Sequence, residues 1–320
     1  MDTLIENPEV TVHANAQWPG ADVPAISVIA PTFKYNASRL LESLGRQITD
    51  QPFEVLLYDD GSMSPSLNDT HRQAIEALPV PAQFISAKTN VGRSLARNAL
   101  IARARSDWIL LMDADMLPDT YSFISSYLSA IGSLAQNRAA AICGGFSLQQ
   151  ASSTSETRLH VAQSLASECL PSEERQKQPG LSIFTSNALV HKDVLKQTPF
   201  DPGFSGWGWE DVDWGIRIGQ SFPIYHINNT ATHLGLDRDH DLVRKYGSAG
   251  DNFRRLMALH PVETDQMKLA RLVKKLRSMP ALSQFASMSR SAALTRWLPL
   301  RIRLAALKAF RTFTYAKDAK

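Results

Sequence analysis

Cysteine is scarce in this chain of 320 residues, which contains only Cys143 and Cys169. Neither lies in a C-x-x-C word, and no histidine stands at zinc spacing beside either of them. The sequence therefore indicates neither a disulfide scaffold nor a structural zinc site, and it fits a reducing compartment.

Long apolar runs are also missing. No stretch approaches the roughly 18 to 20 uncharged apolar residues that span a membrane. The first part of the chain carries Asp2, Glu6, Glu9 and Asp22, whereas a secretory signal needs a basic start and an apolar core. We therefore expect a cytoplasmic protein without a spanning helix, for which attachment to the inner face of the cell membrane stays open.

A large excess of charge of one sign is absent, because 34 Lys and Arg side chains nearly balance 31 Asp and Glu, for a net charge of +3. This balance does not suggest a nucleic-acid partner. It conceals two opposed parts, however. Residues 261–320 hold 13 basic and 3 acidic side chains, a net of +10, whereas residues 1–260 hold 21 and 28, a net of −7.

What the chain does contain is the composition of a globular protein, 44% hydrophobic and 20% charged. Apolar segments typical of strands alternate with helical patterns, which predicts an α/β fold with a mainly parallel sheet flanked by helices. We expect a loose N-terminal lead-in over 1–24, a catalytic domain over 25–260 and a basic helical tail over 261–320. Strands are expected at 25–30, 53–58, 82–86, 108–112 and 139–146, two more within 221–236, and helices at 38–48, 69–78 and 94–104. The polar residues 150–180 are expected to form a mobile loop or an insertion with some helix, after which order resumes over 183–191.

Two of the first four predicted strands end in paired aspartates, Asp59-Asp60 and Asp113-Ala114-Asp115. Ligands of open α/β sheets bind at the carboxyl ends of the strands, where crowded carboxylates favour a divalent cation. In the second pair, one carboxylate can bind the metal while the other takes a ribose hydroxyl. A cation held there would neutralise a nucleotide diphosphate leaving group. The alternatives are a plain Asp-Gly turn and an acidic helix cap.

Asn90-Val91-Gly92-Arg93 precedes the helix that leads to the second acidic pair, and Arg97 lies within that helix. Guanidinium groups are suited to phosphate recognition. Arg97 can equally belong to a solvated helix face.

The most unusual segment is Trp207-Gly208-Trp209-Glu210-Asp211-Val212-Asp213. Glycines let the backbone approach a substrate, tryptophans offer flat faces to a sugar ring, and a carboxylate can take a proton from an attacking hydroxyl. An acidic helix start explains the carboxylates but not the density of tryptophan and glycine. We therefore favour a functional site over a purely structural one.

His233 follows this acidic cluster in Thr232-His233-Leu234-Gly235. A single histidine is often structural. Its position after the acidic pairs makes it a candidate for a further metal ligand, with His226 and His240 as competitors.

Together these segments resemble the inverting family 2 glycosyltransferases with the GT-A fold, over about residues 25 to 240. The matching motifs occur in the order typical of the family. They are Ser27 to Phe33 (SVIAPTF), Asp59-Asp60-Gly61-Ser62, Asn90-Val91-Gly92-Arg93 with Ala96-Arg97-Asn98, Asp113-Ala114-Asp115, and Gly206 to Asp211 (GWGWED). The last word is similar to that of bacterial polymerising and galactosaminyl-type members. Phe33-Lys34-Tyr35 departs from the more usual Tyr-Asn of the family.

The resemblance implies a role for each matching residue. Asp113 would meet the ribose, Asp115 and His233 would bind Mn²⁺ or Mg²⁺, and Asp211 would be the catalytic base beside Glu210. The nucleotide-sugar donor would contact Pro31, Thr32, Asp60, Asn90, Arg93, Asp113 and Ala114, with Asp60 at the uracil edge. The acceptor would meet Trp207, Gly208 and Trp209.

The implied reaction moves a sugar from a nucleotide-sugar, expected to be a UDP-sugar, to a hydroxyl of a glycan or lipid-linked acceptor with inversion. It would serve bacterial polysaccharide or glycoconjugate synthesis. The chain lacks the Gln-x-x-Arg-Trp word of processive synthases, which favours single addition. The alternatives are a nucleotidyltransferase, whose glycine-rich loop is missing after the first strand, and a non-catalytic sugar-binding scaffold.

The tail is predicted to form helices with basic outer faces. Over 267–277, Leu269, Leu272, Val273 and Leu276 share one face while the rest is basic, the pattern of a surface helix. Residues 296–313 mix apolar and basic side chains less regularly. Either these helices pack on the catalytic domain, or residues 262–320 bind an anionic membrane surface.

Overall fold

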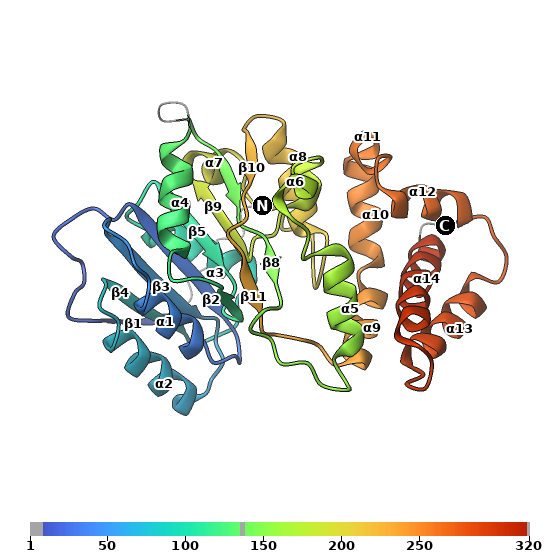
Figure 1. Cartoon of the computed structure of the whole chain (residues 1–320), viewed down its shortest axis with the longest axis horizontal. Coiled ribbons are helices and arrows are strands. Elements are labelled where there is room, and N and C mark those ends of the chain that lie inside the picture. Colours follow the sequence, from blue (N-terminus) through green and yellow to red (C-terminus); the bar gives the residue numbers. More distant parts are fainter. Residues whose placement is uncertain (1–8, 135–137, 319–320) are drawn as a thin grey trace.

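The computed structural model describes residues 9–134 and 138–318 and is built around one twisted eight-stranded sheet (Figure 1). Four of its seven neighbouring strand pairs are parallel, which confirms the predicted α/β fold. Strand β9 breaks the pattern because it runs antiparallel to both of its neighbours. In sheet order the strands are β1 (Val10–Ala14), β4 (Ala82–Ala87), β3 (Phe53–Asp59), β2 (Ile26–Thr32), β5 (Trp108–Met112), β9 (Asn187–His191), β7 (Ala141–Cys143) and β10 (Ile224–His226).

Helices cover both faces of this sheet because its central strands are apolar on both sides. Alternate residues of β2 point to opposite faces, so Val28 and Ile29 belong to different cores. The core around Val28 is completed by α1 (Ser38–Gly45), α2 (Pro65–Glu76) and α4 (Phe123–Gly132). The core around Ile29 is completed by α3 (Arg93–Arg103), α7 (Lys192–Gln197) and α8 (Glu210–Gly219).

A second, three-stranded sheet lies beside the first, in the order β6 (Met116–Pro118), β11 (Ala231–His233) and β8 (Phe146–Ser147). Strands β6 and β11 are antiparallel, with His233 opposite Met116. This register brings the end of the Asp113-Ala114-Asp115 word next to a histidine more than a hundred residues later in the chain.

Three expectations for local structure need correction. The lead-in contains an ordered element, because β1 pairs with the edge strand β4, while residues 1–8 lie outside the described residues. The helix expected over 38–48 ends at Gly45, so Ile48 lies beyond it, where its N–H donates to the Tyr121 carbonyl and its side chain is 71% exposed. The strand expected over 139–146 is interrupted at the Gly144-Gly145 pair and forms the separate strands β7 and β8.

The polar stretch 150–180 has the helical content expected of it. It contains α5 (Arg158–Ser167), α6 (Ser172–Arg175) and the start of the 3₁₀ turn η1 (Pro179–Ser182). Arg175 is buried and donates hydrogen bonds to the backbone carbonyls of Cys143, Gly144 and Ile227. This stretch is therefore tied to the sheet by a buried guanidinium.

The C-terminal part of the chain is helical and packs on the rest of the molecule, as one of the two interpretations of the tail expected. Its helices are α9 (Asp239–Ser248), α10 (Gly250–Leu259), α11 (Pro261–Thr264), α12 (Lys268–Leu276), α13 (Leu282–Leu294) and α14 (Leu300–Asp318). Tyr315 of α14 shares a core with Ile216 of α8 and Phe253 of α10. In Figure 1 the tail helices lie at the opposite end of the molecule from β1 and β4. Among the described residues, no helix combines the length and the apolarity needed to cross a bilayer.

Candidate active site

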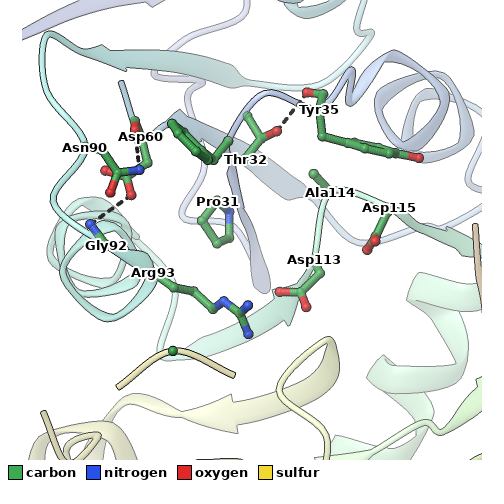
Figure 2. A pocket seen from close by; sticks show the side chains of 12 residues that line it. Pro31, Thr32, Tyr35, Asp60, Asn90, Gly92, Arg93, Asp113, Ala114 and Asp115 are labelled. Atoms are coloured by element: carbon green, nitrogen blue, oxygen red, sulfur yellow. Dashed lines mark hydrogen bonds between the residues drawn. The ribbon is translucent and has the colours of Figure 1, made fainter. Parts of the chain in front are cut away.

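The predicted donor-binding residues lie together around one cavity of about 550 Å³ (Figure 2). It lies at the carboxyl ends of β2, β3 and β5, where an α/β sheet binds its ligands. All seven predicted donor residues and Asp115 line it, together with residues that the motifs did not single out for a role. The lining is Pro31, Thr32, Phe33, Tyr35, Asp60, Asn90, Gly92, Arg93, Asp113, Ala114, Asp115 and Gly206.

Asp60 organises the loop that precedes α3. Its two carboxylate oxygens accept hydrogen bonds from the N–H groups of Val91 (2.8 Å) and Gly92 (2.9 Å), and its carbonyl accepts one from the Asn90 side chain (2.9 Å). Gly61 permits this approach, since it has φ +72° and a Cβ there would lie 2.4 Å from the backbone of Thr89. The Asp-Gly pair is thus a turn that joins the two segments predicted to bind the donor.

Asp113 points into the cavity and is paired with Arg97, whose Nη2 lies 2.8 Å from Asp113 Oδ1. Arg97 is only 3% exposed, so the interpretation of this residue as part of a solvated helix face is wrong. A buried guanidinium needs a partner, and Asp113 supplies it. Arg93, one turn earlier, extends toward Asp113 from the rim of the cavity (Figure 2).

Asp115, the second aspartate of the Asp113-Ala114-Asp115 motif, pairs with His233. Its Oδ2 lies 3.2 Å from His233 Nε2. Leu234 N–H donates to the Asp115 carbonyl at 2.8 Å and holds the two segments together. Burial alone would raise the pKa of Asp115, but the hydrogen bond and the charge of His233 outweigh it and lower this pKa. The competitor His226 bonds Arg175 and the Pro179 carbonyl instead, and burial lowers its pKa to about 4.

The Asp115–His233 pair fits a divalent cation that shares its coordination with a substrate. Among the described residues, no three His, Cys, Asp or Glu side chains surround one metal position. Mg²⁺-type sites often use only one or two protein groups, with phosphate oxygens and water as the remaining ligands. The space beside the pair is kept open by Gly235, where a Cβ would lie 2.1 Å from Asp115 Oδ2. An imidazole in the donor set favours Mn²⁺ over Mg²⁺.

Asp211 and Glu210 begin helix α8 beside this cavity. Asp211 accepts hydrogen bonds from Thr185 through its N–H (3.1 Å) and its hydroxyl (2.8 Å). Burial raises the pKa of Asp211, although the charge of Arg97 opposes the shift. Glu210 lies 3.3 Å from Arg93, and burial followed by the charge of Asp211 raises its pKa. Thr185 was missed because no sequence pattern links it to Asp211.

The tryptophans of this segment pack more deeply than expected of sugar-binding faces. The Trp209 ring lies against Phe253, with ring centroids 4.5 Å apart, and Trp207 meets Tyr246 at 5.4 Å. Trp214 is fully buried and donates a hydrogen bond to the Thr198 carbonyl. Both Trp207 and Trp209 remain partly exposed, so their acceptor role stays a prediction.

The backbone at Trp209 is held in an unusual conformation immediately before the two acids. Its φ of +75° is in the left-handed region, which costs a residue with a side chain about 1–3 kcal/mol. Phe253 of α10 and Tyr315 of α14 enclose the ring, and Trp209 Nε1 donates to the Tyr315 hydroxyl at 3.4 Å. The C-terminal helices therefore support the segment that carries Glu210 and Asp211.

We expect Tyr315→Ala to lower the free energy of unfolding by about 3–5 kcal/mol, the usual cost of deleting a buried aromatic ring. Tyr315→Phe keeps the ring and loses one weak hydrogen bond, so it should cost about 1 kcal/mol or less. Urea unfolding of both variants measures the difference. Equal stability of the two variants would show that the tail does not support Trp209.

The sheet with carboxylates at its carboxyl edge and a flanking carboxylate–histidine pair has the GT-A fold of glycosyltransferases, the fold it shares with a solved mannosyltransferase. More narrowly, the model of the glycosyl transferase family 2 domain matches residues 27–198, which is 172 of the 320 residues. The chain therefore belongs to glycosyl transferase family 2, as the motif order indicated.

Curated relatives agree with this family. The chain is 27% identical over 238 residues to validoxylamine A glucosyltransferase of Streptomyces hygroscopicus subsp. limoneus, covering 63% of this chain and 50% of that protein. It is 29% identical over 221 residues to hyaluronan synthase of Pasteurella multocida, covering 60% and 22%. The chain thus spans about half or less of the length of these relatives.

Solved structures support the fold alone, because their sequences are distant. A mannosyltransferase, PcManGT from Pyrobaculum calidifontis, solved with GDP-Man and Mn²⁺, superposes with a TM-score of 0.56 at 15% identity, covering 94% of this chain and 89% of that one. Residues 1–349 of TarS from S. aureus superpose with a TM-score of 0.50 at 14% identity, covering 90% of each chain.

Proposed function

We propose that this protein is a metal-dependent glycosyltransferase that moves a sugar from a nucleotide-sugar, a UDP-sugar in the first instance, to a hydroxyl of a glycan or lipid-linked acceptor, with inversion. We place the reaction in bacterial polysaccharide or glycoconjugate synthesis. The observation that carries the proposal is the single cavity at the strand ends, where Asp60, Arg93, Asp113 and Asp115 converge beside α8.

The donor would lie along the strand ends. Of the residues that line the cavity, Asp60 and Asn90 would border the base, Pro31 and Thr32 would contact the nucleotide, and Asp113 would accept a hydrogen bond from the ribose. Arg97 holds the Asp113 carboxylate in a fixed orientation through this ion pair. Arg93 is surrounded by carboxylates that raise its pKa although burial opposes them, so it stays cationic and can pair with a phosphate.

Asp115 and His233 would hold Mn²⁺ or Mg²⁺. A bound divalent cation supplies Lewis-acid stabilisation of the negative charge on a departing diphosphate. The names of the similar proteins, a hyaluronan synthase, a glucosyltransferase and a mannosyltransferase, point to different sugars. We therefore do not infer the identity of the donor sugar from any of them.

Asp211 would act as the base. Its Thr185 contacts fix the carboxylate at the start of α8, and burial raises its pKa toward the range in which a carboxylate takes a proton effectively. Inversion follows when the deprotonated acceptor oxygen attacks the anomeric carbon from the side opposite the diphosphate. Trp207, Gly208 and Trp209 precede this base and would form the acceptor wall.

The experiment that tests the function is a screen of UDP- and GDP-sugars with Mn²⁺ and short glycan or lipid-linked acceptors. We expect release of the nucleoside diphosphate together with a lengthened acceptor, and loss of both in chelator. Pyrophosphate release from a nucleoside triphosphate and a sugar phosphate would instead identify a nucleotidyltransferase. Donor binding without turnover across the whole panel would identify a scaffold.

We further propose that the protein works at the inner face of the membrane, with residues 262–320 against an anionic surface. The net charge of +10 over 261–320 supports this attachment. It is separable from the catalytic proposal, since none of the donor-binding residues belongs to the tail.

A further inference from the structure

The turn between α13 and α14, together with the first turn of α14, presents apolar side chains to the outside. We call residues 295–302 the α13–α14 corner. Trp297 is 84% exposed, the largest exposed fraction of any large hydrophobic side chain among the described residues, and Ile302 is 50% exposed. Leu300 is also exposed, and Met288 of α13 is 68% exposed. Exposed tryptophan beside aliphatic residues usually marks an interaction surface.

The amphipathic segment 267–277, one candidate for membrane contact within the tail, has most of its apolar face turned inward. In α12, Ala270 and Val273 are buried against the body of the molecule, and Leu269 and Leu276 pack against the same core. Its outer face presents mainly charge, including Lys268, Arg271 and Lys275, with Leu272 as a 38% exposed apolar side chain among them. The apolar contact surface of the tail lies instead at the corner.

The corner is held rigidly, which distinguishes it from a loose loop. Arg303 is buried, donates to the Ala293 carbonyl at 2.9 Å and forms an ion pair with buried Asp239 of α9. Arg296 lies 2.9 Å from Glu156 of the 150–180 stretch. Trp297 thus projects from a scaffold fixed on two sides, and little further ordering is needed when it meets a partner.

The side chains at the α13–α14 corner, an exposed tryptophan flanked by arginines, are better suited to contact with a lipid bilayer than with a groove on another protein. Tryptophan is enriched where a bilayer meets water, and exposed Arg290 and Arg301 flank the apolar residues. Basic residues near an anionic surface add attraction that falls with salt. The α13 and α14 helices also lie at one end of the molecule, opposite β1 and β4 (Figure 1).

We propose that the α13–α14 corner is the membrane-docking surface of this protein. Trp297, Leu300 and Ile302 enter the boundary between headgroups and acyl chains of a bilayer that contains anionic lipid, while Arg290 and Arg301 contact the headgroups. The proposal rests on the attachment part of the proposed function and names the residues that perform it. It does not depend on the donor, the metal or the base.

The test measures partition of the full chain into vesicles of phosphatidylcholine alone and of phosphatidylcholine with phosphatidylglycerol. Deleting residues 262–320 is unsuitable, because it removes Tyr315 from the core under Trp209. The variant is Trp297→Ser, and the matched control is Ile48→Ser, which changes a similarly exposed residue of the catalytic domain. We expect about a ten- to hundredfold loss of partition for Trp297→Ser, the value of one buried apolar side chain, and no change for the control.

Each outcome bears on a different part of the proposal. If the unsubstituted chain fails to partition into either vesicle, both the attachment and the corner are overturned, while glycosyl transfer is untouched. If it partitions and Trp297→Ser partitions equally, the corner is wrong and attachment uses another surface. If the chain partitions equally into vesicles with and without phosphatidylglycerol, Arg290 and Arg301 do not contribute by contacting anionic headgroups.

Discussion

An Asp211→Asn variant is expected to lose about 10²- to 10⁴-fold in turnover, the usual contribution of a general base. Asparagine has the same shape, and its side-chain oxygen can still accept a hydrogen bond from Thr185 at the site where Asp211 does. It is not basic, so the acceptor hydroxyl keeps its proton. Release of nucleoside diphosphate at saturating donor measures the loss.

Glu210→Gln is the matched control, because Glu210 is the neighbouring acid of the same helix and is already engaged by Arg93. We expect a smaller loss for it than for Asp211→Asn. The reverse order would assign the base to Glu210 and leave Asp211 as a structural partner of Thr185.

The pH profile of the unsubstituted enzyme gives an independent readout. A base works only when deprotonated, so activity falls as the pH drops through its pKa. Burial raises the pKa of Asp211, so this fall should occur above the ordinary range of about 3.9 for aspartate. The residual activity of Asp211→Asn should not show the same fall.

The second large effect is expected from Gly235→Ala, which adds one carbon at the proposed cation site. The backbone φ of Gly235 is one that alanine adopts, so strain in the chain is not the cause. The new Cβ would lie 2.1 Å from Asp115 Oδ2, closer than these atoms can approach, and 3.1 Å from His233 Nε2, a tight contact. Asp115 must therefore move away from its position beside His233.

We expect Gly235→Ala to weaken Mn²⁺ binding by about 10- to 100-fold, as when the surroundings of a metal ligand are disturbed. Calorimetric titration with Mn²⁺ in the presence of nucleoside diphosphate measures it without relying on activity. Gly132→Ala, a site with no atom within 4 Å of the added carbon, is the control. Unchanged affinity in Gly235→Ala would mean that Asp115 and His233 do not hold the cation.

Much of the donor side of the site was predictable, because it depends on short-range pattern. Apolar runs that end in Asp59-Asp60 and Asp113-Ala114-Asp115 are local features, and parallel strands place their carboxyl ends at one edge whatever the rest of the chain does. The order of the family words then indicated glycosyl transferase family 2, which the family match confirms. The sequence by itself thus determined the class of fold, the family and the residues around the cavity.

Tertiary structure alone decided which contacts those residues make. The helical pattern around Arg97 allows a solvated position for this side chain. Only the packing of the elements shows that it is buried and paired with Asp113. Thr185 meets Asp211, and Tyr315 encloses Trp209, across separations of 26 and 106 residues. Gly235 lies beside Asp115, where only a glycine leaves the space open, because β6 and β11 pair in one register. Such contacts arise from the packing of elements that are distant in the chain, and no local periodicity records them.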